Sequence, residues 1–81
     1  MSGVLLVRYF AGARAAAGVP EEKLEAATLD ELTALITADR AHLASVLTAC
    51  SFLVDGVSWR DRTATLPPAA TVDVLPPFAG G

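Results

Sequence analysis

The chain has 81 residues, of which 53% are hydrophobic and 19% charged, and its formal net charge is −3. This length suits one small domain with a single core, and so apolar a composition argues against a disordered chain. The six Lys and Arg residues are scattered along the sequence, which argues against the basic stripe that nucleic-acid binding normally requires. The single cysteine, Cys50, excludes an internal disulfide and a cysteine-based metal cluster.

Neither a signal peptide nor a membrane-spanning segment is expected. The apolar run at residues 4–10 is too short for the hydrophobic region and cleavage site of a signal peptide. No stretch approaches the roughly 20 apolar residues that a membrane span requires. The sequence therefore predicts a cytoplasmic protein.

The first third of the chain predicts two strands around a short helix. Residues 4–10 are aliphatic or aromatic except for Arg8, which favours a buried strand with Leu5, Val7 and Tyr9 on one face. The alanine-rich segment that follows predicts a short helix ending at Gly18, in the left-handed conformation. Residues 21–26 predict an edge strand.

A capping box marks the start of the main helix. The Thr28 hydroxyl can accept a hydrogen bond from the Glu31 amide while the Glu31 carboxylate returns one to the backbone. This helix is expected to run to about Asp39. The apolar side chains expected on one of its faces are Leu29, Leu32, Leu35 and Ile36. A second short helical piece is predicted from the spacing of Leu43, Val46, Leu47 and Cys50.

The last third of the chain predicts a hairpin and a final strand. Residues 51–54 and 57–60 flank Asp55-Gly56, which suits a two-residue hairpin turn. Pro67 and Pro68 mark a further turn, and residues 72–75 form the last strand. A small mixed β-sheet packed on one main helix is the economical arrangement of these elements. The sequence thus predicts an α+β fold of the β-grasp (ubiquitin-like) type, with residues 1–75 as the domain and residues 76–81 as an extended tail.

The tail is the part of the sequence that points to chemistry. Pro76 and Pro77 should end the last strand and keep the following residues extended. Six extended residues reach at most roughly 20 Å, which is enough to thread a carboxylate into a pocket of another protein. The side chains absent from Gly80 and Gly81 leave a narrow channel unobstructed. The tail therefore indicates a group carrier, with an ordinary frayed terminus as the alternative.

The sequence resembles the small subunit of molybdopterin synthase and its sulfur-carrier relatives, the MoaD/ThiS-like family. The resemblance covers essentially the whole chain and rests on Val7-Arg8-Tyr9-Phe10-Ala11, Arg14, Gly18, the capped helix, Val54-Asp55-Gly56 and Val74-Leu75-Pro76-Pro77-Phe78-Ala79-Gly80-Gly81. The paired prolines favour the molybdopterin branch over the thiamine sulfur carriers. Two departures, Ala15 in place of an acidic residue and Pro68-Ala69-Ala70-Thr71 in place of an Asp-Gly-Asp-type turn, loosen the assignment to one pathway.

The resemblance implies a role as a sulfur donor without an active site of its own. A separate adenylating (E1-like) enzyme would use ATP to activate the Gly81 carboxylate, and sulfur would then displace AMP to leave a thiocarboxylate. The large catalytic subunit of molybdopterin synthase would direct this sulfur to a cyclic pterin precursor of the molybdenum cofactor. The chain itself would bind no cofactor. The residues that would hold the tail in these partners are Pro76, Pro77, Phe78, Ala79 and Gly80.

Other candidate residues are better explained by structure. Cys50 lies at core spacing with Val46 and Leu47, and the lone His42 has no evident catalytic partner. No glycine-rich phosphate loop is present, so ATP binding by this chain is not expected. Arg60 and Arg62 suit a solvated turn. Trp59 is a partner-binding candidate if its face of the hairpin lies outside the core.

Three alternatives to the molybdopterin role stay open. The same thiocarboxylate could supply sulfur for cysteine or thiamine synthesis. The same activated Gly81 could instead form an isopeptide bond, as in a ubiquitin-like protein modifier. A plain β-grasp interaction domain would need neither Gly80 nor Gly81.

Overall fold

The computed structural model describes residues 3–77. Its helices and strands follow the chain in the order β1 (Val4–Tyr9), α1 (Ala11–Ala17), β2 (Glu21–Glu25), α2 (Leu29–Thr37), α3 (Ala41–Leu47), β3 (Ser51–Val54), β4 (Val57–Ser58) and β5 (Thr71–Leu75). Four residues of the predicted tail, Phe78, Ala79, Gly80 and Gly81, lie outside the described residues.

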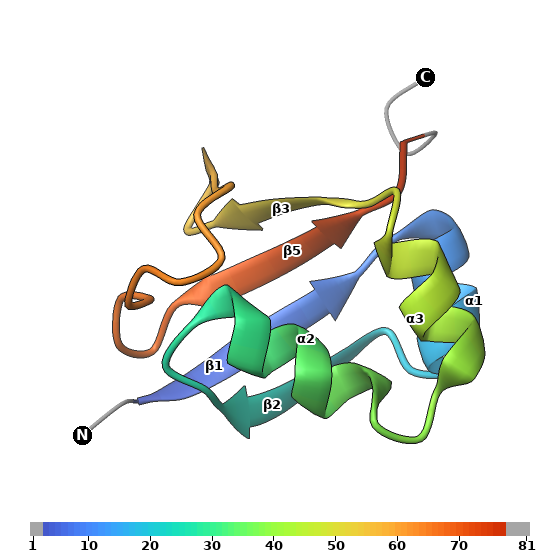
Figure 1. Ribbon diagram of the computed structural model, residues 1–81, viewed down its shortest axis with the longest axis horizontal. Coiled ribbons are helices and arrows are strands. Elements are labelled where there is room, and N and C mark those ends of the chain that lie inside the picture. Colours follow the sequence, from blue (N-terminus) through green and yellow to red (C-terminus); the bar gives the residue numbers. More distant parts are fainter. Residues whose placement is uncertain (1–2, 78–81) are drawn as a thin grey trace.

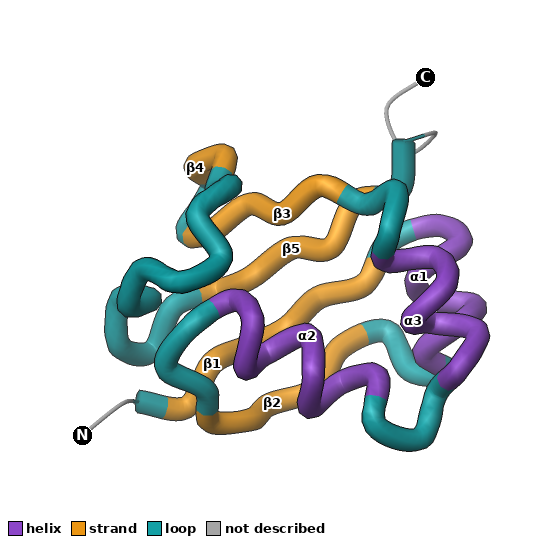
Figure 2. Tube along the Cα trace, in the orientation of Figure 1, coloured by secondary structure: helices purple, strands orange, loops and turns teal. Residues whose placement is uncertain are grey.

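The five strands form one mixed sheet in the order β2-β1-β5-β3-β4. The central strands β1 and β5 are parallel, and every other neighbouring pair is antiparallel. Helix α2 crosses one face of the sheet, while α1 and α3 lie together at the end where β1 and β5 finish (Figures 1 and 2). This arrangement confirms the predicted β-grasp fold: α2 is the expected main helix, and α1 and α3 are the short helical pieces expected before and after it in the sequence. Among residues 3–77, no helix has the length and apolar character to cross a bilayer.

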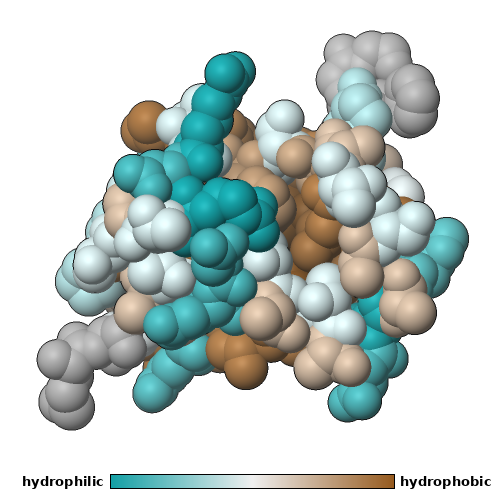
Figure 3. Space-filling model, in the orientation of Figure 1, coloured by the Kyte–Doolittle hydropathy of each residue, from teal (hydrophilic) through white to brown (hydrophobic). Residues whose placement is uncertain are grey.

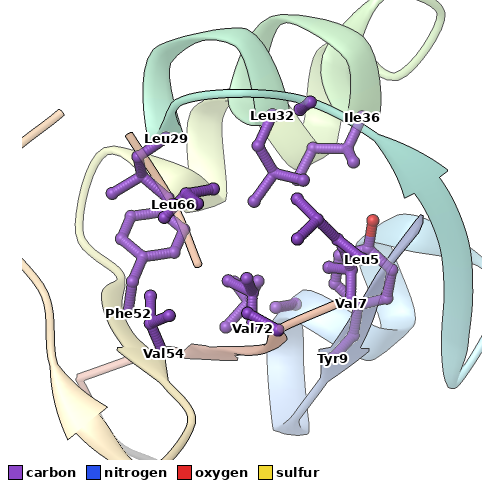
Figure 4. Close-up of a cluster of buried hydrophobic side chains, with 14 of the residues drawn as sticks. Leu5, Val7, Tyr9, Leu29, Leu32, Ile36, Phe52, Val54, Leu66 and Val72 are labelled. Carbon is purple, nitrogen blue, oxygen red and sulfur yellow. The ribbon is translucent and has the colours of Figure 1, made fainter. Parts of the chain in front are cut away.

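The core lies between the sheet and α2, where alternate strand residues meet the apolar stripe of the helix (Figure 4). Strand side chains alternate between the two faces, so every second residue points inward. Leu5, Val7 and Tyr9, which the alternation in β1 placed on one face, are all buried, so this is the inward face of the strand. The other strand and α2 residues of this core are Phe52, Val54, Val72, Val74, Leu29, Leu32 and Ile36.

The start of α2 has the predicted capping box. The Glu31 amide donates to Thr28 Oγ1 (3.2 Å), and the Glu31 carboxylate accepts from the Ala27 amide (3.0 Å). The prediction for Leu35 is wrong, because this side chain is 53% exposed. Leu29, Leu32 and Ile36 are the buried side chains of α2, whereas Leu35 lies on a part of the helix surface that the core does not cover.

The turns follow their predicted chemistry. Gly18 ends α1 with φ 82°, and Asp55 and Gly56 form the hairpin turn with φ 49° and 81°. Strand β4 is shorter than predicted and ends at Ser58. The Trp59 amide still donates to the Phe52 carbonyl of β3 at 2.9 Å, and the Trp59 indole donates to the Asp61 carbonyl, after which the chain crosses toward α2. There the Arg62 guanidinium pairs with Asp30 at 2.7 Å.

A polar network joins β1, β2 and the segment between α2 and α3. The Tyr9 hydroxyl donates to Glu22 Oε2 at 2.5 Å, and the Arg40 guanidinium donates to the same carboxylate. Burial, followed by the contact with Glu22, raises the pKa of Tyr9. The network therefore fixes edge strand β2 and the turn before α3 to the central strand.

Acid is expected to weaken this network. The Arg40 hydrogen bond is the largest cause that lowers the pKa of Glu22 below its ordinary value. A lowered carboxyl pKa stabilises the fold fully above the unfolded-chain value of about 4.3, and this contribution is lost as the pH falls through the lowered value. Urea unfolding of the wild type and Glu22→Gln should show a stability difference at neutral pH that shrinks below about pH 4. A difference that stays constant on acidification would contradict this account.

Candidate functional site

The predicted tail follows a strand, β5, that has a neighbouring strand on each side. Strand β5 is paired on both sides up to its end, where Leu75 lies opposite Ser51 of β3 and the Phe10 amide donates to the Val74 carbonyl at 3.3 Å. Pro76 is buried against the domain, and Pro77 is exposed. The chain therefore leaves the sheet from its middle, with its last described residue in solvent.

The roles of the tail residues stay predictions. Pro76 and Pro77 are described, and the first of them packs in the domain while the second is free to contact a partner. Phe78, Ala79, Gly80 and Gly81, the other members of the predicted site, lie outside the described residues. The described start of the tail follows directly on β5, which lies between β1 and β3 in the sheet.

No helix of residues 3–77 covers the second face of the sheet, which we call the open face (Figure 1). It borders the tail because alternate residues of β5 point to it, ending with Leu75. The charged centre of this face is a cross-strand pair of Arg8 and Asp73. Its members include Leu6, Arg8, Phe10, Leu53, Asp73 and Leu75.

The pair at the centre of the open face is bidentate. Arg8 Nε donates to Asp73 Oδ1 at 2.6 Å, and Arg8 Nη2 donates to Asp73 Oδ2 at 2.9 Å. The Arg8 side chain is 46% exposed, whereas that of Asp73 is 11% exposed. The hydrogen bond to Asp73 raises the pKa of Arg8 further, so the guanidinium is always charged. The Phe10 ring centroid lies 5.8 Å from its central carbon, which is within cation–π range.

The helical side of the molecule has two adjoining hollows, of about 440 and 310 Å³. Cys50, Phe52 and Arg62 line both hollows. Figure 3 shows an apolar depression on this side, next to hydrophilic side chains. The Arg62 guanidinium at its rim already bonds Asp30 and the Thr33 hydroxyl, so its charge is compensated.

The other candidate residues of the sequence analysis are Cys50, His42 and Trp59. The Cys50 thiol is partly buried against the core and donates to the Val46 carbonyl at 3.3 Å. Burial raises the pKa of this thiol, which makes it a poorer nucleophile at neutral pH. His42 is exposed on α3. Trp59 is half-buried and packs partly against the core, while Val57 on the same face of the hairpin is exposed.

Within residues 3–77, no group of three or more His, Cys, Asp or Glu side chains is placed to hold a metal ion. The sequence reasoning missed the Arg8–Asp73 pair. A single charged residue in an apolar strand was its one signal, and the partner, 65 positions away, becomes visible only when β1 and β5 are known to be adjacent.

Comparison with known proteins places the chain in a family. The model of the ThiS family matches residues 7–81, whereas no curated protein matches the chain significantly. A solved structure from Pyrococcus furiosus, described as molybdopterin converting factor, subunit 1, is 25% identical over 95% of this chain and 100% of its own, with a TM-score of 0.82.

Two further structures share the fold. Small archaeal modifier protein 1 from Methanosarcina acetivorans is 23% identical over 100% of this chain and 99% of its own, with a TM-score of 0.83. A complex of subunits 1 and 2 of the molybdopterin-converting factor from Helicobacter pylori contains a chain that is 22% identical over 96% of this chain and 99% of its own, with a TM-score of 0.75. With a family match that runs from β1 to Gly81 and a β-grasp fold that these structures share, the chain belongs to the ThiS family.

Proposed function

We propose that the chain is a sulfur carrier and the small subunit of a molybdopterin synthase. The observation that carries this proposal is the extent of the family match, which continues through the tail to Gly81. The central strand β5 leads directly into that tail and holds its first proline in the domain. The start of the tail is thus held by the sheet, which suits a segment that would enter a partner.

The proposed chemistry takes place at the Gly81 carboxylate. A carboxylate is a poor electrophile, so an adenylating enzyme first joins it to AMP from ATP and releases pyrophosphate. Sulfide then attacks the acyl carbon and AMP leaves, which gives the thiocarboxylate. In the synthase, this sulfur passes to a cyclic pterin precursor of the molybdenum cofactor. The carboxylate is restored by water.

In this proposal the chain supplies the carried group, and its partners supply the catalytic groups. Its residues supply the carried group and the means to present it: Gly81 bears the sulfur, Gly80 gives clearance, and Pro77 and Phe78 contact the partner. The acids, bases and ATP-binding groups belong to the partners in this proposal. A large subunit as one partner is supported by the Helicobacter pylori structure, in which subunits 1 and 2 form a complex. The adenylating enzyme is required by the chemistry of the carboxylate.

A second candidate function is a ubiquitin-like protein modifier. It is favoured by the structural similarity to small archaeal modifier protein 1 from Methanosarcina acetivorans. The two functions share the adenylated Gly81 and differ in the nucleophile that takes it, which is sulfide for a carrier and a lysine amine for a modifier. Sulfur carriers for cysteine or thiamine synthesis differ only in the acceptor.

Intact mass spectrometry separates these functions. The purified chain is incubated with its cognate adenylating enzyme, ATP and sulfide, and a parallel sample lacks ATP. A sulfur carrier gains the mass difference between sulfur and oxygen at Gly81, only with ATP. Covalent adducts with larger proteins would instead establish a modifier. An unchanged mass with an enzyme proven active would contradict both proposals.

A further inference from the structure

The two adjoining hollows on the helical side form one trough, which we call the helical trough. Cys50, Phe52 and Arg62 line both of its parts. One end lies between α2 and α3, and the other lies beside the β3–β4 hairpin, where Trp59 and Arg60 line it. The trough opens on the side of the molecule that Figure 3 shows.

The end between the helices offers an apolar surface. Thr33, Thr37 and Thr48 line this end, but each donates its hydroxyl to a backbone carbonyl three or four residues earlier. These hydroxyl protons are therefore not available to a ligand. The other side chains of this end, apart from the Asp30–Arg62 pair at its rim, are Ala34, Ala44, Leu47, Cys50 and Phe52. Such a lining favours an apolar side chain of a partner.

The hairpin end offers a cation and unused hydroxyl groups. Among residues 3–77, Arg60 takes part in no ion pair and no side-chain hydrogen bond, whereas Arg62 is paired with Asp30. Ser51 and Ser58 line the same end, and both are exposed. A guanidinium beside hydroxyl donors favours a carboxylate, which accepts charge-assisted hydrogen bonds.

Hydrogen bonds to the backbone hold the hairpin end in place. The Trp59 indole donates to the Asp61 carbonyl at 2.9 Å. The Asp61 carboxylate accepts from the amides of Thr63 and Ala64 at 3.0 and 3.1 Å, and it forms no ion pair with Arg60. Trp59 is thus a fixed wall of the trough. Tryptophan and arginine are enriched among the residues that carry most of the binding energy at an interface.

The two ends together favour a protein segment that carries an apolar side chain and a carboxylate. A small anion would leave the end between the helices unfilled, and a purely apolar ligand would leave Arg60 without a partner. An apolar centre with a charged and hydroxylated rim is the usual composition of a protein–protein interface. The free charge of Arg60 makes the acidic side chain the complementary one.

The trough lies at the base of the tail. Cys50 and Ser51 line it, and Ser51 lies opposite Leu75, the last residue of β5. A protein seated in the trough is therefore held next to the point where the tail leaves the sheet. In the proposed function, sulfur has to reach Gly81 while this residue is joined to AMP. The protein that brings the sulfur must be close to the tail at that stage.

We infer that the helical trough is the docking site for the protein that delivers sulfur as a cysteine persulfide, which places an apolar and acidic segment in it. The inference rests on the proposed function, because that function requires a source of sulfur. The terminal persulfide sulfur bonds to the acyl carbon as AMP leaves, and a thiol then cleaves the sulfur–sulfur bond. The products are the thiocarboxylate and a disulfide of the donor. Docking raises the effective concentration of the persulfide at Gly81, whereas free sulfide gains nothing from it.

Charging from two sulfur sources tests the inference. The mass gain at Gly81 is measured with the adenylating enzyme, ATP and either free sulfide or a persulfide-loaded sulfurtransferase of the same organism. Thiol reductant is added only after the reaction is stopped, because it would release sulfide from the persulfide. Arg60→Glu should slow charging from the sulfurtransferase by about tenfold or more. Charging from sulfide should stay within about twofold of wild type.

A second variant and a matched control sharpen the result. Ala44 is exposed on α3, so Ala44→Gln keeps the helix and places a polar side chain over the apolar end, with the same expected loss. The control is Arg14→Glu, because Arg14 is also exposed and forms no ion pair among residues 3–77, yet lines neither hollow. Its ratio of the two rates should equal that of the wild type. Thermal unfolding checks that each variant is folded.

The outcomes distinguish the docking site from the proposed function. Wild-type charging of Arg60→Glu or Ala44→Gln from the sulfurtransferase would overturn the docking site. An equal loss with both sulfur sources would also overturn it, since the trough would then serve the adenylating enzyme. A wild-type chain charged from sulfide alone would overturn the docking site and leave the proposed function intact. A wild-type chain that neither source charges would overturn both.

Discussion

A chain extended by one alanine after Gly81 is expected to lose charging with sulfur. The added residue moves the reactive carboxylate away from the adenylating site and converts the Gly81 carbonyl into an amide. Misplacement of a reacting group by only about 1 Å can cost roughly 100-fold in rate, and one residue moves it further than that. Charging should therefore fall by about 100-fold or more, as measured by the mass gain per minute with the adenylating enzyme, ATP and sulfide.

The control for this result uses the same extended chain. An extension that begins after Gly81 and can be removed by a carboxypeptidase or a specific protease allows the native end to be restored, and charging should return with it. A second variant, Gly81→Val, keeps the length and adds a branched side chain at the reacting residue. Normal charging of either blocked form would contradict the role of Gly81.

The largest loss of stability is expected from Leu32→Ala. Leu32 is fully buried between α2 and the sheet. Truncation of a buried leucine to alanine costs about 2–5 kcal/mol, through lost burial and the cavity that remains. Domains of this size unfold with only about 5–15 kcal/mol, so Tm should fall by roughly 10 °C or more. Urea and thermal unfolding by circular dichroism measure both quantities.

The same helix offers the matched control. Leu35 is 53% exposed, so Leu35→Ala removes the same atoms without opening a cavity. Alanine also has the higher helix propensity, and the change should stay within about 0.5 kcal/mol of wild type. Equal losses at both positions would mean that the sheet covers more of α2 than the structure shows.

Local patterns were sufficient to predict most elements of the fold. The capping box at Thr28 and Glu31, the left-handed Gly18 and the Asp55-Gly56 turn each depend on a few neighbouring residues, and all three were confirmed. The alternation in β1 likewise placed Leu5, Val7 and Tyr9 on one face, and the structure shows that this face is buried. These features could be predicted because their physical causes lie within a few residues of one another.

The misses depend on packing between distant segments. Whether Leu35 is covered depends on how far the sheet extends beneath α2, and the sequence of the helix carries no record of this. The Arg8–Asp73 pair requires β5 to lie beside β1. The tail itself was singled out from sequence by its glycines.

The position of β5 between β1 and β3 also has a mechanical consequence. A pull on Pro77 along the strand acts in shear on the hydrogen bonds of two ladders at once, whereas a strand at the edge of a sheet can be peeled away one bond at a time. The bidentate bridge from Arg8 to Asp73 adds a cross-link two residues from the end of the loaded strand. When the tail is pulled out of a tight channel, the domain should therefore move with it as a rigid body, and β5 should stay paired in the sheet.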